Sequence, residues 1–207
     1  MRILVIGDSH IPRRASEVPP IIQGMLNQLS SQLFDYTFFT GDLINAPNFV
    51  QFLKIHTKND VFIVIGNMDY YGGNSSAPPC QKLILPIGRD EKINIGLIHG
   101  HQISPRGDHS QLELLALEND FNILISGHTH KDEIYLTDEG ILLLNPGSVT
   151  GAWSFVASGK PSFMIIIIDE MKREFSIFLY FYESRDQKVR EINTSFIMKD
   201  NKIRRKL

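Results

Sequence analysis

Short, mainly apolar runs recur along this chain, and each is followed by a glycine or a polar turn. Residues 2–6, 36–40 and 61–65 are such runs, and apolar positions at helical spacing over 21–33 and 47–56 lie between them. The runs have the length of buried strands, and their alternation with helices predicts parallel strands joined by right-handed crossovers. Because the runs lack alternating polar residues, we expect this sheet to be covered on both faces.

The pattern changes in the second part of the chain. A predicted helix over 110–118 precedes an apolar run at 121–125, and no convincing helical spacing is visible beyond residue 130. Successive short strands without helices between them predict a second, mostly antiparallel layer. We therefore expect an α/β fold, a two-sheet sandwich flanked by helices. The remaining predicted strands cover residues 81–85, 93–98, 133–136, 141–144, 162–168, 174–182 and 188–193.

Composition and charge exclude several classes of protein. A net charge of −2, with 43% hydrophobic and 21% charged residues, is ordinary for a globular domain and gives no general attraction to nucleic acid or membranes. Cys80 is the only cysteine, which excludes an internal disulfide and favours a reducing compartment. The apolar start ends at Gly7, which is too early for a signal peptide. We expect one intracellular domain over 1–195 and a mobile basic tail over 196–207.

Residues suited to metal coordination follow five of the predicted strands. Taken singly, Asp42 could be a turn residue and His99 a buried core residue. Taken together, these residues lie beyond the carboxyl ends of strands, where open α/β sheets bind ligands. Carboxylate, amide and imidazole ligands suit Mn²⁺, Zn²⁺ or Fe²⁺, and this number of ligands suits two ions about 3.5–4 Å apart. The candidate ligands are Asp8, His10, Asp42, Asn67, His99, His128 and His130.

Five sequence blocks carry a resemblance to a known family, the calcineurin-like metallophosphoesterases. The blocks are Gly7-Asp8-Ser9-His10, Gly41-Asp42, Gly66-Asn67-Met68-Asp69, His99-Gly100-His101 and Gly127-His128-Thr129-His130. The resemblance implies that Asp42 bridges two ions, which together activate water for attack on a phosphoester. It also implies that one ion takes Asp8, His10, Asp42 and His130, and that the other takes Asp42, Asn67, His99 and His128.

The third block departs from the family at Met68. The family usually has a histidine there that protonates the leaving oxygen, whereas a methionine side chain has no proton to give. Loss of a general acid typically costs about 10²–10⁴-fold in rate. His101 is the candidate substitute, and some small prokaryotic phosphodiesterases of the family also lack the histidine. We expect weak metal-dependent phosphodiesterase activity at most.

A second set of blocks resembles a narrower group, the small phosphoesterase-fold subunits of retromer, the complex that retrieves cargo from endosomes to the Golgi or the cell surface. The resemblance implies a cytoplasmic scaffold, monomeric outside the complex, that docks on the large α-solenoid subunit and reaches endosomal membranes only through its partners. Ile11, Pro12 and Ile103 are next to the ligands in sequence, so we expect them to contact the solenoid. The blocks cover residues 7–13, 95–102, 145–148, 150–152 and 161–163.

Two functions therefore remain open. A retromer scaffold with a degenerate metal site predicts an exposed apolar patch for a partner. An active metal-dependent phosphodiesterase predicts a substrate cleft above the ions.

Overall fold

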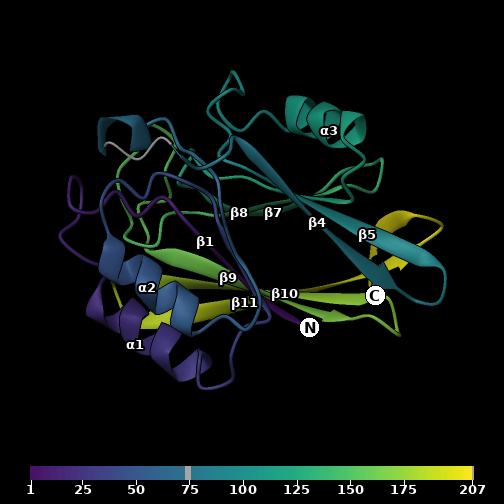
Figure 1. The fold of residues 1–207 in the computed structure, drawn as a ribbon, viewed down its shortest axis with the longest axis horizontal. Helices are drawn as coiled ribbons and strands as arrows, with labels where there is room; N and C mark the ends of the chain where they lie inside the picture. The colour runs from purple at the N-terminus through teal and green to yellow at the C-terminus, as the bar shows by residue number, and fades with distance from the viewer. Residues whose placement is uncertain (73–75, 207) are drawn as a thin grey trace.

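Two β-sheets pack face to face, and helices cover the outer side of each sheet (Figure 1). The structure, a computed structural model, describes residues 1–72 and 76–206. The α/β sandwich predicted from the apolar pattern is confirmed by this arrangement.

The first sheet has seven strands in the order β12-β11-β10-β9-β1-β2-β3. Strand β1 pairs in parallel with β2, and β2 pairs in parallel with β3, as expected for strands joined by helical crossovers. Strand β9 pairs antiparallel to the other edge of β1, and the later strands extend the sheet by antiparallel pairing. The strands are β1 (Arg2–Ile6), β2 (Tyr36–Phe39), β3 (Val61–Ile63), β9 (Ser162–Asp169), β10 (Glu174–Glu183), β11 (Lys188–Lys199) and β12 (Lys202–Arg205).

The second sheet has five strands in the order β4-β5-β6-β8-β7. Its three central strands are parallel, whereas β4 and β7 pair antiparallel at the two edges. The parallel strands thus form the centre of the five-stranded sheet, whereas in the seven-stranded sheet they are the last three strands of the order, β1, β2 and β3. The strands are β4 (Cys80–Ile87), β5 (Glu91–Ile98), β6 (Ile123–Ile125), β7 (Asp132–Leu136) and β8 (Leu142–Pro146).

In the part of the chain that the structure describes, three α-helices and one 3₁₀ helix complete the fold. Helices α1 (Pro20–Leu29) and α2 (Pro47–Ile55) cover the seven-stranded sheet, α3 (His109–Glu118) covers the five-stranded sheet, and η1 (Asp69–Gly72) follows β3 (Figure 1). Both α1 and α2 begin with a proline, whose fixed φ suits the first turn of a helix. Within the described residues, no helix is long and apolar enough to cross a membrane.

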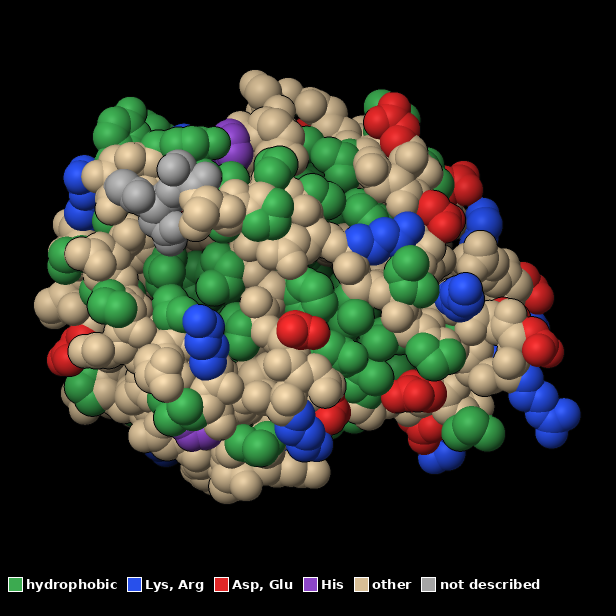
Figure 2. Space-filling view, viewed as in Figure 1, with side chains coloured by type: hydrophobic (Ala, Val, Ile, Leu, Met, Phe, Trp, Pro, Cys, Tyr) green, Lys and Arg blue, Asp and Glu red, His purple; other side chains and the backbone are tan. Residues whose placement is uncertain are grey.

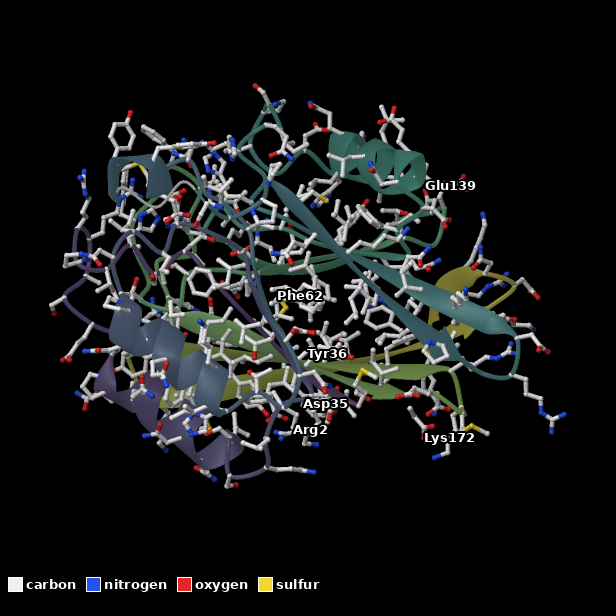
Figure 3. All side chains as sticks on the ribbon, viewed as in Figure 1. Arg2, Asp35, Tyr36, Phe62, Glu139 and Lys172 are labelled. Atoms are coloured by element: carbon white, nitrogen blue, oxygen red, sulfur yellow. The ribbon has the colours of Figure 1, made fainter. Side chains whose placement is uncertain are left out.

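The apolar core lies in three layers because successive strand residues face opposite sides of a sheet. In β1, Ile3 and Val5 pack between the two sheets, whereas Leu4 and Ile6 pack under α1 and α2. Tyr36 and Phe62 lie at the edge of the inter-sheet layer, with ring centroids 6.0 Å apart (Figure 3). On the face shown in Figure 2, apolar side chains reach the surface between the two sheets. Full burial of an aliphatic side chain such as Ile3 or Leu4 contributes about 1.5–3 kcal/mol to the stability of the fold.

The end of the chain differs from the expected mobile tail. Residues 196–199 finish β11, and β12 pairs antiparallel with them, so the described part of 196–207 belongs to the seven-stranded sheet. Phe196, Met198 and Ile203 are at most 1% exposed and pack in the inter-sheet core. The basic residues between these apolar ones hid the alternation that marks a half-buried hairpin. Residue 207 lies outside the described residues.

Candidate metal centre

The carboxyl ends of five strands bring all seven predicted ligands together. Three of these strands belong to one sheet and two to the other, so the centre lies at the edge that the two sheets share. The loops after the strands carry Asp8 and His10 (β1), Asp42 (β2), Asn67 (β3), His99 (β5), and His128 and His130 (β6).

Four of the ligands form a closed group, which we call the first half-site: Asp8, His10, Asp42 and His130. One ligand atom from each lies within 4.8 Å of those of the others, and all four residues are buried. His10 Nε2 lies 3.3 Å from Asp42 Oδ2 and 3.0 Å from His130 Nε2. His130 Nε2 in turn lies 3.3 Å from Asp8 Oδ1.

The second half-site consists of Asp42, Asn67, His99 and His128. His99 Nε2 lies 3.6 Å from Asp42 Oδ2 and 3.1 Å from Asn67 Oδ1. The rings of His99 and His128 have their centroids 5.1 Å apart. Asp42 faces both half-sites, which is the place that a bridging carboxylate requires.

The orientation of the imidazoles fits a cation. His99 Nδ1 donates to the carbonyl of Thr40 at 2.7 Å, and His130 Nδ1 donates to the carbonyl of Ala152 at 2.7 Å. Each Nε2 therefore directs its lone pair toward carboxylate, amide or imidazole acceptors in the centre. His10 Nδ1 is also buried without a hydrogen-bond partner among the described residues. A divalent ion would be stabilised by this convergence of lone pairs, with the second ring nitrogens fixed as is usual for metal-bound histidines.

Proton affinities in the centre agree with this interpretation. Burial lowers the pKa of both His10 and His128 to about 3, which keeps these rings neutral, as metal ligands must be. Burial would raise the pKa of Asp8, yet its contact with His130 and the nearby imidazoles lower it to about 2. Burial raises the pKa of Asp42 to about 6. Burial would lower the pKa of His130, but its hydrogen bond to Asp8 raises it.

The loop backbones adopt a conformation that side chains rarely accept. Five ligands have φ between 49° and 67°, and the β-branched Ile44 has φ of 69°. Such residues cost about 1–3 kcal/mol each and cluster at functional sites. The five ligands are Asp8, His10, Asp42, His128 and His130.

Glycines next to the ligands allow close approach of the loops. A Cβ at Gly66 would clash with the Asp42 carboxylate, and a Cβ at Gly127 would clash with Asp8 Oδ2. These two positions therefore require glycine for packing against the ligands.

Asp69 is a positioning residue to which the sequence analysis assigned no role. It is buried, and its carboxylate accepts hydrogen bonds from the backbone N–H groups of Asp42 (2.9 Å), Ile44 (2.8 Å) and Gly66 (2.8 Å). One carboxylate thus joins the β2 loop to the β3 loop. The sequence contains one indication of this role: Asp69 comes three residues after Gly66, in the turn that carries Asn67.

Met68 and His101 define the open side of the second half-site. Met68 contributes through its backbone, because its N–H donates to Asp42 Oδ1 at 2.8 Å. His101 is exposed, and its ring centroid lies 5.5 Å from that of His99 and 6.3 Å from that of His128. His101 is therefore next to the ligands, where a proton donor could act.

The expected partner contacts at Ile11 and Ile103 need correction. Ile11 is 9% exposed and packs under α1 and α2, and Ile103 is 6% exposed and packs beneath α3. Both side chains are part of the core of the chain itself and are not free to anchor a partner. Pro12 is exposed, as expected.

Other apolar residues are exposed beside the centre. Arg14 donates to the carbonyl of Trp153 at 2.8 Å, next to the Ala152 carbonyl that binds His130. The Arg106 guanidinium lies 5.7 Å from the ring centroid of Phe155, and Arg13 lies 5.9 Å from that of Tyr71. We call these residues, Arg13, Arg14, Tyr71, Arg106, Trp153 and Phe155, the aromatic rim. The three aromatic residues are 64–77% exposed.

The two-sheet sandwich, with a buried Asp/His group that could hold a metal ion, is a fold of the phosphoesterase class. Residues 1–171 match the calcineurin-like phosphoesterase superfamily domain, and the chain belongs to this family. A protein of Methanothermobacter thermautotrophicus described as a probable metallophosphoesterase is 36% identical over 177 residues, which are 86% of this chain and 91% of that protein.

Solved structures of vacuolar protein sorting 29 (Vps29) are similar over nearly the whole chain, which confirms the predicted resemblance. That of Cryptosporidium parvum has a TM-score of 0.79 and 32% identity and covers 95% of this chain and 97% of its own. Wild-type Vps29 of Entamoeba histolytica complexed with Zn²⁺ has a TM-score of 0.76 and 32% identity, with coverage of 93% and 99%.

Proposed function

We propose that this protein is a retromer subunit that acts as a scaffold in the retrieval of cargo from endosomes to the Golgi or the cell surface. Its similarity to Vps29 spans both chains almost completely, and Met68 stands where the family usually has a proton-donating histidine. The partner is the large α-solenoid subunit, and the protein reaches endosomal membranes from the cytoplasm through its partners.

The observation that carries this proposal is the aromatic rim. Exposed aromatic residues and arginines are the residue types that carry most of the binding energy in protein interfaces. Arg14 and Arg106 are close enough to the centre that their charges help to lower the pKa of His10 and His128, although burial is the main cause for both. A solenoid end that covers the rim would therefore also cover the metal centre.

The proposal predicts that the rim and not the core binds the partner. Trp153→Ser with Phe155→Ser should weaken the retention of a helical solenoid protein from native extract by about 30-fold or more. Their exposure means that the melting temperature should change little. Met171→Ser is a matched control, because Met171 is 79% exposed in the turn after β9, at the opposite end of that strand.

Two results would overturn the scaffold assignment. One is the failure of the wild-type chain to retain a solenoid protein. The other is retention that the double substitution leaves unchanged. Ile103→Asp is unsuitable for this test, since an unpaired charge in the core beneath α3 would unfold the protein.

Phosphodiesterase activity is a second function, favoured by the complete convergence of the seven ligands. Two ions of the Mn²⁺, Zn²⁺ or Fe²⁺ type would supply an activated water and stabilise charge on the phosphate. Asp42 would hold both ions, and the buried imidazoles would remain neutral to coordinate them. Hydrolysis of bis(4-nitrophenyl) phosphate with Mn²⁺, above the rate of Asp42→Ala, would support this function, whereas equal rates would exclude it.

A further inference from the structure

A cavity that opens to the surface lies behind the metal-ligand loop, and its lining combines basic, hydroxyl and apolar side chains. It measures about 220 Å³ and lies between the start of α3, the loop over 126–131, and strands β7 and β8. Ser126 and Thr129 contribute to its wall, whereas none of the seven metal ligands does. The cavity is therefore separate from the metal centre, although both share one loop.

The charged groups of the cavity leave an excess of positive charge. Its single carboxylate, Glu133, accepts hydrogen bonds from Lys131 at 2.7 Å and from His109 at 2.9 Å. Burial would raise the pKa of Glu133, but these two bonds lower it, so the carboxylate is charged and already satisfied. Arg106 has no carboxylate partner among the described residues. An arginine without a counter-ion at the mouth of a cavity favours an anion.

Two hydroxyl groups also have hydrogens free to donate. Ser126 is 6% exposed, and its Oγ forms no hydrogen bond with any residue that the structure describes. Thr129 Oγ1 accepts hydrogen bonds from Asn145 Nδ2 at 3.0 Å and from Lys131 N at 3.1 Å. Its lone pairs are thus occupied, and its own hydrogen remains available. The Ser126 hydroxyl lines the cavity, so it can donate its hydrogen to an acceptor on a ligand there.

The rest of the wall is apolar. Leu112 and Leu143 are at most 5% exposed and belong to the core under α3, and Val156 closes the side next to the aromatic rim. The volume is below the roughly 300–1,000 Å³ of pockets for drug-sized ligands. A ligand that matches this wall is small and combines one anionic group with a short hydrocarbon arm.

We propose that this cavity binds a small organic carboxylate, with its oxygens on Arg106, Ser126 and Thr129 and its hydrocarbon arm on the leucines. The site goes beyond both proposed functions: it contains none of the seven metal ligands, and it shares only Arg106 with the aromatic rim. It would also place a ligand against the loop that carries His128 and His130.

Isothermal titration of the full-length chain with 3-methylbutanoate tests the site. The neutral isostere 3-methylbutanamide should bind at least tenfold more weakly, because it cannot replace the charge-assisted bond to Arg106. Acetate and inorganic phosphate should also bind more weakly, since neither reaches the apolar wall. All titrations should give the same result with a chelator present, which excludes binding of the carboxylate to metal ions.

Substitutions locate the binding. Arg106→Gln should weaken 3-methylbutanoate roughly 10- to 100-fold, and Ser126→Ala roughly 2- to 10-fold. Arg185→Gln removes the same charge from the exposed turn after β10 and should change nothing. No heat of binding at millimolar 3-methylbutanoate would overturn the proposal. Equal affinity for the amide, or wild-type affinity in Arg106→Gln, would overturn it as well.

Discussion

The two half-sites of the metal centre share Asp42 but differ in how firmly the fold holds them. In the first half-site, all four residues are at most 2% exposed, and their ligand atoms form one closed group. In the second, Asn67 is half-buried and Met68 and the exposed His101 border the ligands. The first half-site is thus fully buried, whereas the second is buried at His99 and His128 and reaches the surface at its border.

Removal of Asp42 should have the largest effect, because this residue faces both half-sites. Asp42→Ala should abolish measurable binding of Mn²⁺ or Zn²⁺ at both positions in isothermal titration. The metal-free fold should melt only a few degrees lower, because the one backbone group that loses its acceptor is the Met68 N–H and burial disfavours the charge of Asp42. Retention of one full-affinity ion in this variant would show that the half-sites do not share a ligand.

Asp69→Ala should have the next largest effect, and it should reach both half-sites through the backbone. Three N–H groups would lose their acceptor, at about 1–3 kcal/mol each, so the melting temperature should fall by roughly 6 °C or more. Metal affinity should fall about 10- to 100-fold, as for other residues that hold ligands in place. Asp60→Ala, at an exposed carboxylate, is the control for both measurements. An unchanged metal affinity would show that the loops hold Asp42 without Asp69.

Much of this centre could be predicted from the sequence because its ligands follow short apolar strands. A buried strand ends sharply, and a glycine with a polar residue after it marks the turn, as at Gly41-Asp42. The parallel order of strands then brings the ends together, without any knowledge of side-chain contacts. This logic predicted the two-sheet sandwich and the closed group of Asp8, His10, Asp42 and His130, whereas metal binding by the seven residues stays a prediction.

The sequence could not show which face of an irregular segment is buried. Ile103 lies in a loop with no period, so its position beside His99 and His101 suggested a surface anchor, whereas the loop turns it under α3. The role of Asp69 depends on backbone donors in the β2 loop, which the spacing within its own loop does not reveal. The exposure of Trp153 and Phe155 was likewise invisible, because aromatic residues are more often part of a core.

Asn67→Ala should separate the half-sites. It removes the amide oxygen that lies 3.1 Å from His99 Nε2. The first half-site keeps all four of its residues, because the two half-sites have only Asp42 in common. One of two bound ions should weaken by about tenfold or more, whereas the other should keep its affinity, because its four ligands are unchanged. Titration with Mn²⁺ should therefore change from one tight phase to two separate phases. Equal weakening of both ions would show that the centre binds metal as a single unit.

Met68→His should have the smallest effect on structure and the most specific effect on chemistry. The Met68 backbone N–H that binds Asp42 Oδ1 remains, so the substitution changes only the side chain on the open side of the second half-site. If the missing proton donor limits hydrolysis, turnover of an alkyl phosphodiester with Mn²⁺ should rise by up to about 10²-fold. Turnover of bis(4-nitrophenyl) phosphate should change little, because a nitrophenolate leaves without protonation.

Met68→Gln has a similar size and no acidic proton in the useful range, and it should leave both rates unchanged. An equal gain in both variants would assign the effect to access and not to acid catalysis. If His101→Asn also lowers the wild-type alkyl rate, His101 already donates the proton, and the second half-site is then a weak but complete catalytic centre.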